Sequence, residues 1–334
     1  MKKKYDVYAI GNALVDYEIE INDGFLNENK VEKGLMTLVD EDRQAELIKA
    51  VENKIKKKQG GGSAANTIIA LSQLGGKGFY SCKVAGDDDG VFYIKDLNDN
   101  GVATNLQPDS LQPGTTGKCL VMISEDAERT MNTFLGITSD FSTNDLAEQA
   151  LANSEYLFIE GYLVSSETGR EAMKAAKRMA EENGVKVSLT FSDPSMVKYF
   201  KKEMEEVVGA AVDLLFCNEE EAMLFTETNT LNEAREELKK AAKKFVITQG
   251  KNGAMVFDGE TFIDIEPYPI KAVDSTGAGD MFSGAFLYGI THGHTYASSA
   301  KLASKASSEI VSKYGPRLAY YELQEIKEAV IGNS

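Results

Sequence analysis

Asp274-Ser-Thr-Gly-Ala-Gly-Asp280 leads into a long apolar run, Met281-Phe-Ser-Gly-Ala-Phe-Leu-Tyr-Gly-Ile290, and the two together predict a helix that begins at the glycines. The start of a helix leaves backbone N–H groups unpaired and carries the positive end of the helix dipole. Small residues at that start let an anion approach the N–H groups closely. The sequence therefore predicts a phosphate-binding site at Gly277-Ala278-Gly279.

Asp280 lies in the first turn of the same predicted helix. A lone aspartate in a first turn more often only complements the helix dipole. Here the Thr-Gly-Ala-Gly context places the carboxylate beside a bound phosphate, where it can accept the proton of an attacking hydroxyl. Because phosphoryl transfer depends mainly on positioning and charge neutralisation, little else is required from the side chains. Asp280 is the predicted general base.

The residues before this stretch alternate between strand-like and helix-like patterns. Strands are predicted at 156–159, 185–191, 214–217 and 245–248, with helices at about 168–183, 195–207, 218–226 and 231–243. A hairpin at 254–257 and 261–265 follows. Such alternation is typical of a parallel sheet covered on both faces, so a three-layer α/β/α fold is expected.

The N-terminal half is predicted to add a smaller sheet. Tyr17–Ile21 alternates polar and apolar residues, and 118–124 and 129–134 form a hairpin around the polar loop 125–128. We expect one domain over residues 1–334, with a lid formed by about 13–40 and 102–135. Ser63 is expected to cap a helix fed by the turn Gly60-Gly61-Gly62, and the basic run Lys54–Lys58 to be a solvated helix end.

Composition excludes several functions. The 334 residues are 43% hydrophobic and 26% charged, which fits a globular protein, and the net charge of −16 disfavours nucleic acid as a partner. Three scattered cysteines and the lack of an 18-residue apolar window predict a cytoplasmic protein that does not cross a membrane. His292 and His294 have no third ligand nearby, so no metal site is expected there.

Asp274–Asp280 resembles the C-terminal signature of the ribokinase-like (PfkB) carbohydrate and nucleoside kinases, from which only Ser275 departs. Four further stretches resemble motifs of the same family in the same order: Gly11-Asn12 with Asp16, Gly60-Gly-Gly-Ser-Ala-Ala-Asn66, Asn218-Glu-Glu-Glu221 and Thr248-Gln-Gly250-Lys-Asn-Gly253. The resemblance covers about residues 5–325, which is nearly the whole chain.

The resemblance implies a role for each of these residues. Asp280 would be the base, and Gly277, Ala278 and Gly279 would form the anion hole. The implied substrate-binding residues are Asn12, Asp16, Gly61, Gly62, Asn66 and Arg129. The implied ATP-binding residues are Asn218, Thr248, Gly250 and Gly253. Glu221 would hold Mg²⁺ through water, since this ion keeps several waters, and Asp274 lies in a loop where many members bind a monovalent cation such as K⁺.

Residues 128–137 and Gly11–Asp16 resemble the adenosine-kinase branch. We therefore expect adenosine and ATP to give AMP and ADP, with Leu14, Phe134 and Tyr162 as candidates for a purine slot. The alternatives are a kinase of ribose, fructose or a 2-keto-3-deoxygluconate-type sugar acid, or a binding protein that has lost catalysis. A dinucleotide oxidoreductase is disfavoured, because no Gly-x-Gly-x-x-Gly follows the first strand. The sequence leaves monomer and homodimer open.

Overall fold

The computed structural model describes residues 3–34, 36–125 and 129–332. Within these ranges the strands form two sheets. The larger sheet contains, in spatial order, β14 (Phe262–Ile265), β13 (Ala254–Phe257), β12 (Phe245–Thr248), β11 (Leu214–Asn218), β10 (Lys186–Thr190), β9 (Ser154–Glu160), β1 (Tyr5–Ile10), β5 (Gly78–Ser81) and β6 (Ala103–Thr104). All neighbours are parallel except at the β12–β13–β14 edge, which is antiparallel.

Helices cover both faces of the large sheet, because its central strands are apolar on both sides. In β1, Val7 and Ala9 enter one core while Tyr8 and Ile10 enter the other. The first core contains residues of α3 (Ser63–Gln73), α4 (Asp88–Asp99), α10 (Ala278–Thr291), α11 (Tyr296–Val311) and α12 (Tyr320–Ile331). The second contains residues of α5 (Glu148–Ala152), α6 (Glu167–Glu182), α7 (Pro194–Val208), α8 (Glu219–Thr226) and α9 (Leu231–Leu238). The predicted three-layer fold is confirmed.

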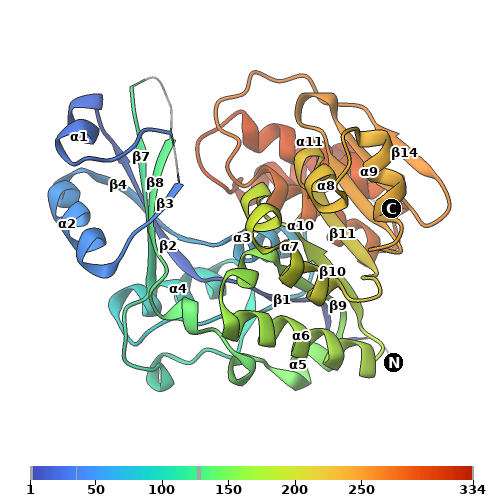
Figure 1. Cartoon of the computed structure of the whole chain (residues 1–334), viewed down its shortest axis with the longest axis horizontal. Helices are drawn as coiled ribbons and strands as arrows, with labels where there is room; N and C mark the ends of the chain where they lie inside the picture. The colour runs from blue at the N-terminus through green and yellow to red at the C-terminus, as the bar shows by residue number, and fades with distance from the viewer. Residues whose placement is uncertain (1–2, 35, 126–128, 333–334) are drawn as a thin grey trace.

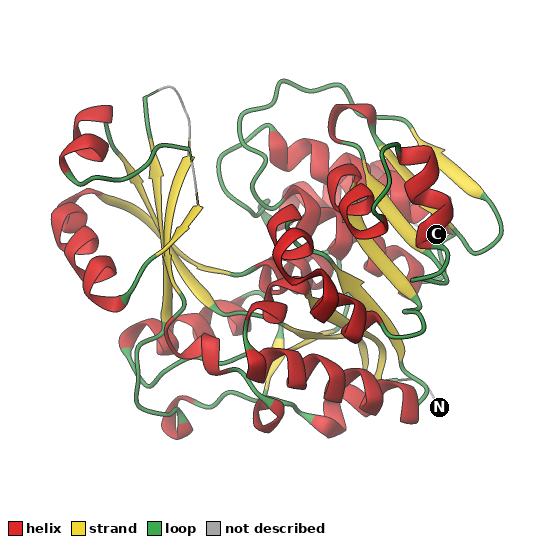
Figure 2. Ribbon diagram, in the orientation of Figure 1, coloured by secondary structure: helices red, strands yellow, loops and turns green. Residues whose placement is uncertain are grey.

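The smaller sheet stands beside the large domain (Figures 1 and 2). Its spatial order is β3 (Met36–Leu38), β8 (Arg129–Phe134), β7 (Gly117–Ile123), β2 (Leu14–Glu20) and β4 (Ile55–Gly61). Helices α1 (Asp23–Glu28) and α2 (Glu41–Val51) cover its outer face, where Leu47 packs in one cluster with Leu120 and Met122. The inner face therefore remains available to the large domain.

The hairpin prediction is confirmed, since β7 and β8 pair antiparallel, although residues 126–128 of its loop lie outside the described residues. The predicted extent of the lid was wrong at two places. β4 belongs to the small sheet but falls outside 13–40 and 102–135, and Ala103–Thr104 pairs with β5 in the large sheet. Helix α2 was not predicted, although it buries Leu47 and Val51.

Three local predictions were also wrong. Lys56–Lys58 lie in β4, at the edge of the small sheet, where lysines discourage pairing with another strand. Gly60 and Gly61 end β4, and Gly62, with φ of 100°, is the residue that precedes α3, so Ser63 is not the cap. The predicted helix 231–243 ends at Leu238, because Ala242 then forms a β-bridge with Val212.

Asp89 in the first turn of α4 joins the two parts of the molecule. Its carboxylate accepts hydrogen bonds from Lys58 Nζ at 2.6 Å, Lys118 Nζ at 2.8 Å and Tyr17 Oη at 2.5 Å, all from strands of the small sheet. Burial raises the pKa of the Asp89 carboxyl, but these three donors outweigh burial and hold the pKa below its ordinary 3.8. The ionised carboxylate is thus the stabilising form.

None of the described helices is both long and apolar enough to span a bilayer. Cys82, Cys119 and Cys217 are buried and form no disulfide.

Asp89→Asn is expected to lower the free energy of unfolding by about 1–3 kcal/mol at pH 7. The loss is smaller than for a fully buried pair, because the two lysine side chains are 30% and 21% exposed. Since the folded pKa is the lower one, the difference from wild type should shrink as the pH falls below 3.8. Urea unfolding measures it, with the exposed neighbour Asp88→Asn as control; equal losses in the two variants would contradict this role.

Candidate active site

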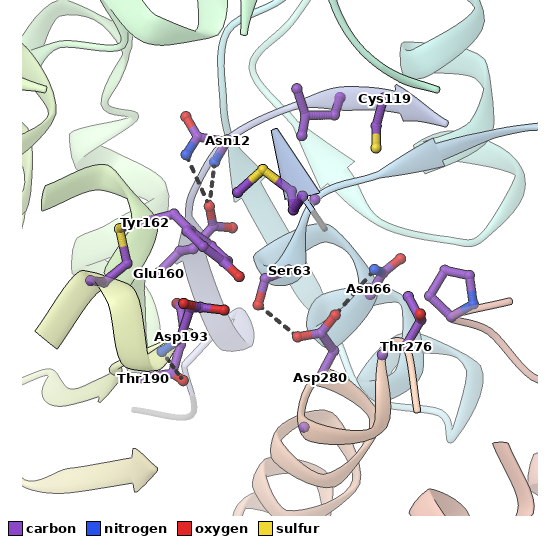
Figure 3. Close-up of a pocket in the computed structure, with 18 of the residues that line it drawn as sticks. Asn12, Ser63, Asn66, Cys119, Glu160, Tyr162, Thr190, Asp193, Thr276 and Asp280 are labelled. Atoms are coloured by element: carbon purple, nitrogen blue, oxygen red, sulfur yellow. Dashed lines mark hydrogen bonds between the residues drawn. The ribbon is translucent and has the colours of Figure 1, made fainter. Parts of the chain in front are cut away.

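A cavity of about 810 Å³ lies between the small sheet and the large domain. Its walls come from the inner face of the small sheet, the beginnings of α3 and α10, and the carboxyl ends of β9, β10, β11 and β12. Ligands of open α/β sheets bind at these carboxyl ends. Figure 3 shows the side chains that converge on the cavity.

The start of α10 presents free N–H groups to this cavity. Among the described residues, no acceptor lies within hydrogen-bonding reach of the N–H groups of Gly277, Gly279 and Asp280, whereas Ala278 N–H donates to Ser275 O at 3.2 Å. A Cβ on Gly279 would meet nothing within 4 Å. The turn before the helix thus uses the Ala278 N–H, while the N–H groups of Gly277, Gly279 and Asp280 are left for a ligand, and the anion hole itself stays a prediction.

Asp280 is held by two donors from the first turn of α3 (Figure 3). Ser63 Oγ donates to Oδ1 at 2.6 Å and Asn66 Nδ2 donates to Oδ2 at 3.1 Å. Burial raises the pKa of Asp280 to about 6, while the two hydrogen bonds and the charge of Arg317 limit the rise. A carboxylate with this pKa is ionised at neutral pH and basic enough to accept a proton.

Asp16 and the glycines before α3 lie together, as predicted. A Cβ on Gly61 would come within 2.5 Å of both Asp16 carboxylate oxygens, and one on Gly62 within 2.2 Å of Asn12 O. No described residue donates a hydrogen bond to Asp16, and burial raises its pKa to about 7. The glycines therefore make room for a carboxylate whose acceptor oxygens remain available to a ligand.

Glu160, at the carboxyl end of β9, was missed by the sequence prediction. Its buried carboxylate accepts hydrogen bonds from Asn12 N at 3.1 Å, Asn12 Nδ2 at 3.2 Å and Ala64 N at 2.8 Å. Burial raises its pKa to about 7. Glu160 fixes Asn12 against the start of α3. An acidic residue that ends a predicted central strand was the available signal.

Thr248, Gly250 and Gly253 line a second cavity of about 420 Å³, together with Tyr268, Ile270 and Ser307 among others. Both cavities reach Gly279 and Phe282, so they meet at the start of α10. Thr248 lines both, whereas Asn218 and Glu221 line only the first. The predicted nucleotide-binding residues are therefore distributed over two adjoining cavities.

Glu221 also has a local structural role. Its carboxylate accepts from Asn218 N at 3.0 Å and Asn218 Nδ2 at 2.9 Å in a capping box, and burial raises its pKa to about 7. In the described part of the chain, no three His, Cys, Asp or Glu side chains are grouped to hold a metal ion, His292 and His294 included. These residues suit a Mg²⁺ ion that is held mainly by water molecules and substrate phosphates, because Mg²⁺ usually keeps several of its waters.

Arg129 reaches from β8 to the loop before α10. Its Nη2 lies 2.7 Å from Asp274 Oδ2, which also accepts from Gly315 N at 2.9 Å, and Oδ1 accepts from Thr276 N at 3.0 Å. A monovalent cation at this carboxylate would have to compete with the guanidinium. Of the three candidates for a purine slot, Leu14 and Tyr162 line the large cavity and Phe134 does not, since the strand alternation turns it away.

The chain belongs to the pfkB family of carbohydrate kinases, whose family model matches residues 36–322. It is therefore a phosphotransferase with an alcohol group as acceptor and ATP as the donor that the family implies. Among solved structures, the "probable sugar kinase protein" of Rhizobium etli is similar over 98% of both chains, with 31% identity and a TM-score of 0.88. The adenosine kinase of Sinorhizobium meliloti is 32% identical over 98% of this chain and 99% of its own, with a TM-score of 0.87.

Among curated proteins, the 5-dehydro-2-deoxygluconokinase of Clostridium perfringens is 24% identical over 98% of this chain and 94% of its own length. The relatives thus act on acceptors of different classes.

Gly61→Ala is expected to raise the KM for the acceptor at least about tenfold, because the new Cβ displaces the Asp16 carboxylate. Steady-state kinetics at saturating ATP measure the effect. Gly86→Ala is the control, since its Cβ would meet only ordinary contacts at 3.5 Å or more. An unchanged KM in Gly61→Ala would show that Asp16 does not bind the acceptor.

Proposed function

We propose that the protein transfers the γ-phosphate of ATP to the primary hydroxyl of a nucleoside, and that adenosine is the acceptor. The observation that carries this choice is the apolar wall that the small sheet places beside Asp16. The wall consists of Leu14, Met36, Leu38, Val121, Met131 and Leu135.

A nucleoside matches the two sides of this cavity. The ribose diol suits Asp16, because a carboxylate has two acceptor oxygens and no described residue occupies them. The flat base suits the apolar wall and the ring of Tyr162, which extends into the cavity (Figure 3). A free sugar has hydroxyls on all sides and would leave them without partners against Met36, Leu38 and Met131.

The proposed reaction uses few groups. Asp280 takes the proton of the attacking hydroxyl, and the free N–H groups at the start of α10 hold the transferring phosphoryl group. When bound, Mg²⁺ supplies charge neutralisation on the phosphates, with Glu221 orienting it through water. The small sheet acts as a lid that excludes water from the phosphate.

A sugar or sugar-acid kinase is the second candidate. The similarity to a 5-dehydro-2-deoxygluconokinase over 98% of the chain favours it. Arg129, the first residue of β8, lines the cavity. It could then bind an acceptor carboxylate if its ion pair with Asp274 broke.

The acceptor is tested by incubating the protein with Mg-ATP and separate nucleosides, ribose, fructose and a keto-sugar acid, following ADP release. We expect the highest kcat/KM with adenosine and AMP as the product. Higher kcat/KM with a sugar or a sugar acid would overturn the choice of acceptor while leaving the kinase assignment intact.

Asp280→Asn is expected to lower kcat by about 10²–10⁴-fold with any accepted substrate, because the amide cannot take the proton. Far-UV circular dichroism and thermal unfolding would show that the variant is folded. Full activity in a folded variant would exclude Asp280 as the base.

The rate should depend on pH on the acid side. Asp280 must be ionised, and its pKa is raised to about 6, while the pKa values of Asp16 and Glu160 are raised to about 7. We therefore expect kcat/KM for the acceptor to fall as the pH drops through 7 to 6. A profile that stays flat down to about pH 5 would contradict these shifts.

A further inference from the structure

Arg317 is a largely buried arginine that lies outside the five sequence motifs described above and does not line either cavity. It follows Pro316 in the segment between α11 and α12, and its side chain is 11% exposed. Its guanidinium donates to three partners: Asn66 Oδ1 from Nε at 3.0 Å, Asp96 Oδ2 from Nη1 at 2.7 Å, and Gly60 O from Nη2. One side chain therefore joins β4, α3 and α4.

The contact with Asn66 fixes the orientation of that amide. A guanidinium has donors only, so the Asn66 carbonyl oxygen must face it. The Asn66 NH₂ group then points at Asp280 Oδ2, to which it donates at 3.1 Å. Without Arg317 the amide can turn over, which would place its oxygen against the carboxylate and repel it.

The contact with Gly60 acts on the other half of the site. Gly60 lies directly before Gly61, whose backbone borders the Asp16 carboxylate. The guanidinium holds the carbonyl of Gly60, and Asp96 holds the guanidinium in place, since its carboxylate is only 18% exposed. The end of β4 is thereby kept at the distance that Asp16 requires.

The charge of Arg317 reaches both carboxylates. Burial is the main cause of the raised pKa values of Asp280 and Asp16, and Arg317 opposes that rise at both. Glu160 at the end of β9 and Asp280 disfavour each other's ionised form, and Asp280 raises the pKa of Glu160. Tyr162, in the segment that follows β9, stays neutral because burial raises its pKa. Arg317 is the cation that acts in the opposite direction on Asp280.

We propose that Arg317 is a positioning residue for catalysis, which orients the Asn66 amide toward Asp280 and holds the Gly60–Gly61 backbone against Asp16. It touches neither substrate by this account and acts through its neighbours. The inference rests on Asp280 acting as the base and holds for either class of acceptor.

Arg317→Met is expected to lower kcat/KM for the acceptor by about 10- to 100-fold, because it loosens the base and the diol site together. It should also move the acid limb of the pH profile to higher pH, since the opposing cation is gone. Arg317→Lys restores the charge but not the fork of donors, so its acid limb should lie near that of wild type while the rate recovers only in part.

Asn66→Ala tests the route through the amide. If Arg317 acts through Asn66, the loss of kcat in the double variant should be much smaller than the product of the two single losses. Arg235→Met is the matched control, since Arg235 lies on α9 and stacks on Phe262, away from both cavities. Its kcat/KM and acid limb should stay as in wild type.

The acceptor with the highest wild-type turnover is used, so a wrong choice of adenosine does not affect the result. Arg317→Met with kcat/KM within about twofold of wild type and an unmoved acid limb would overturn the proposal. If Arg317→Met does not fold, Arg317→Lys serves as the test, and a wild-type rate in that variant would overturn the proposal. Turnover retained by Asp280→Asn would instead show that the base is misassigned.

Discussion

A partly buried carboxylate beside a free helix start is the arrangement on which the rest of the site depends. Asp280 lies in the first turn of α10, where unpaired N–H groups attract an anion, and the same burial that strengthens this attraction also opposes ionisation of Asp280 itself. Hydrogen-bond donors from other elements stabilise the ionised Asp280. Ser63 and Asn66 in α3 donate to its carboxylate, and Arg317 donates to Asn66. Removing Ser63 or Asn66 would leave the partly buried Asp280 carboxylate with one donor fewer.

The residues proposed to bind the acceptor are also closely packed. Gly61 and Gly62 let β4 and α3 approach Asp16 and Asn12 within distances that no side chain would allow. The small sheet turns Asp16 and an apolar wall toward the cavity and packs its other face on α1 and α2, while Asp89 ties it to α4. An acceptor would therefore be held on the small sheet, by Asp16 and the apolar wall, with its attacking hydroxyl facing Asp280 of the large domain.

The sequence predicted features that depend on neighbouring residues. The strand and helix alternation after Tyr156, the glycine-rich helix start and Asp280 are all local patterns, and the fold they predict is confirmed. The errors concern contacts made across the chain. Lys56–Lys58 form an edge strand only because β2 pairs with β4. Ser63 donates its hydroxyl hydrogen bond to Asp280, which lies 217 residues later in the sequence. Arg317 could not be ranked above other charged residues until the fold brought it to Asn66, and the one sequence signal for Glu160 was its place directly after a predicted central strand.

The most direct test of this account is a crystal structure with the preferred acceptor and an unreactive ATP analogue. We expect the attacking hydroxyl within about 2.6–3.2 Å of an Asp280 carboxylate oxygen, and the γ-phosphate on the N–H groups of Gly277, Gly279 and Asp280. A γ-phosphate bound away from the start of α10, or a hydroxyl that faces another carboxylate such as Glu160, would contradict the assignment of Asp280 as the base.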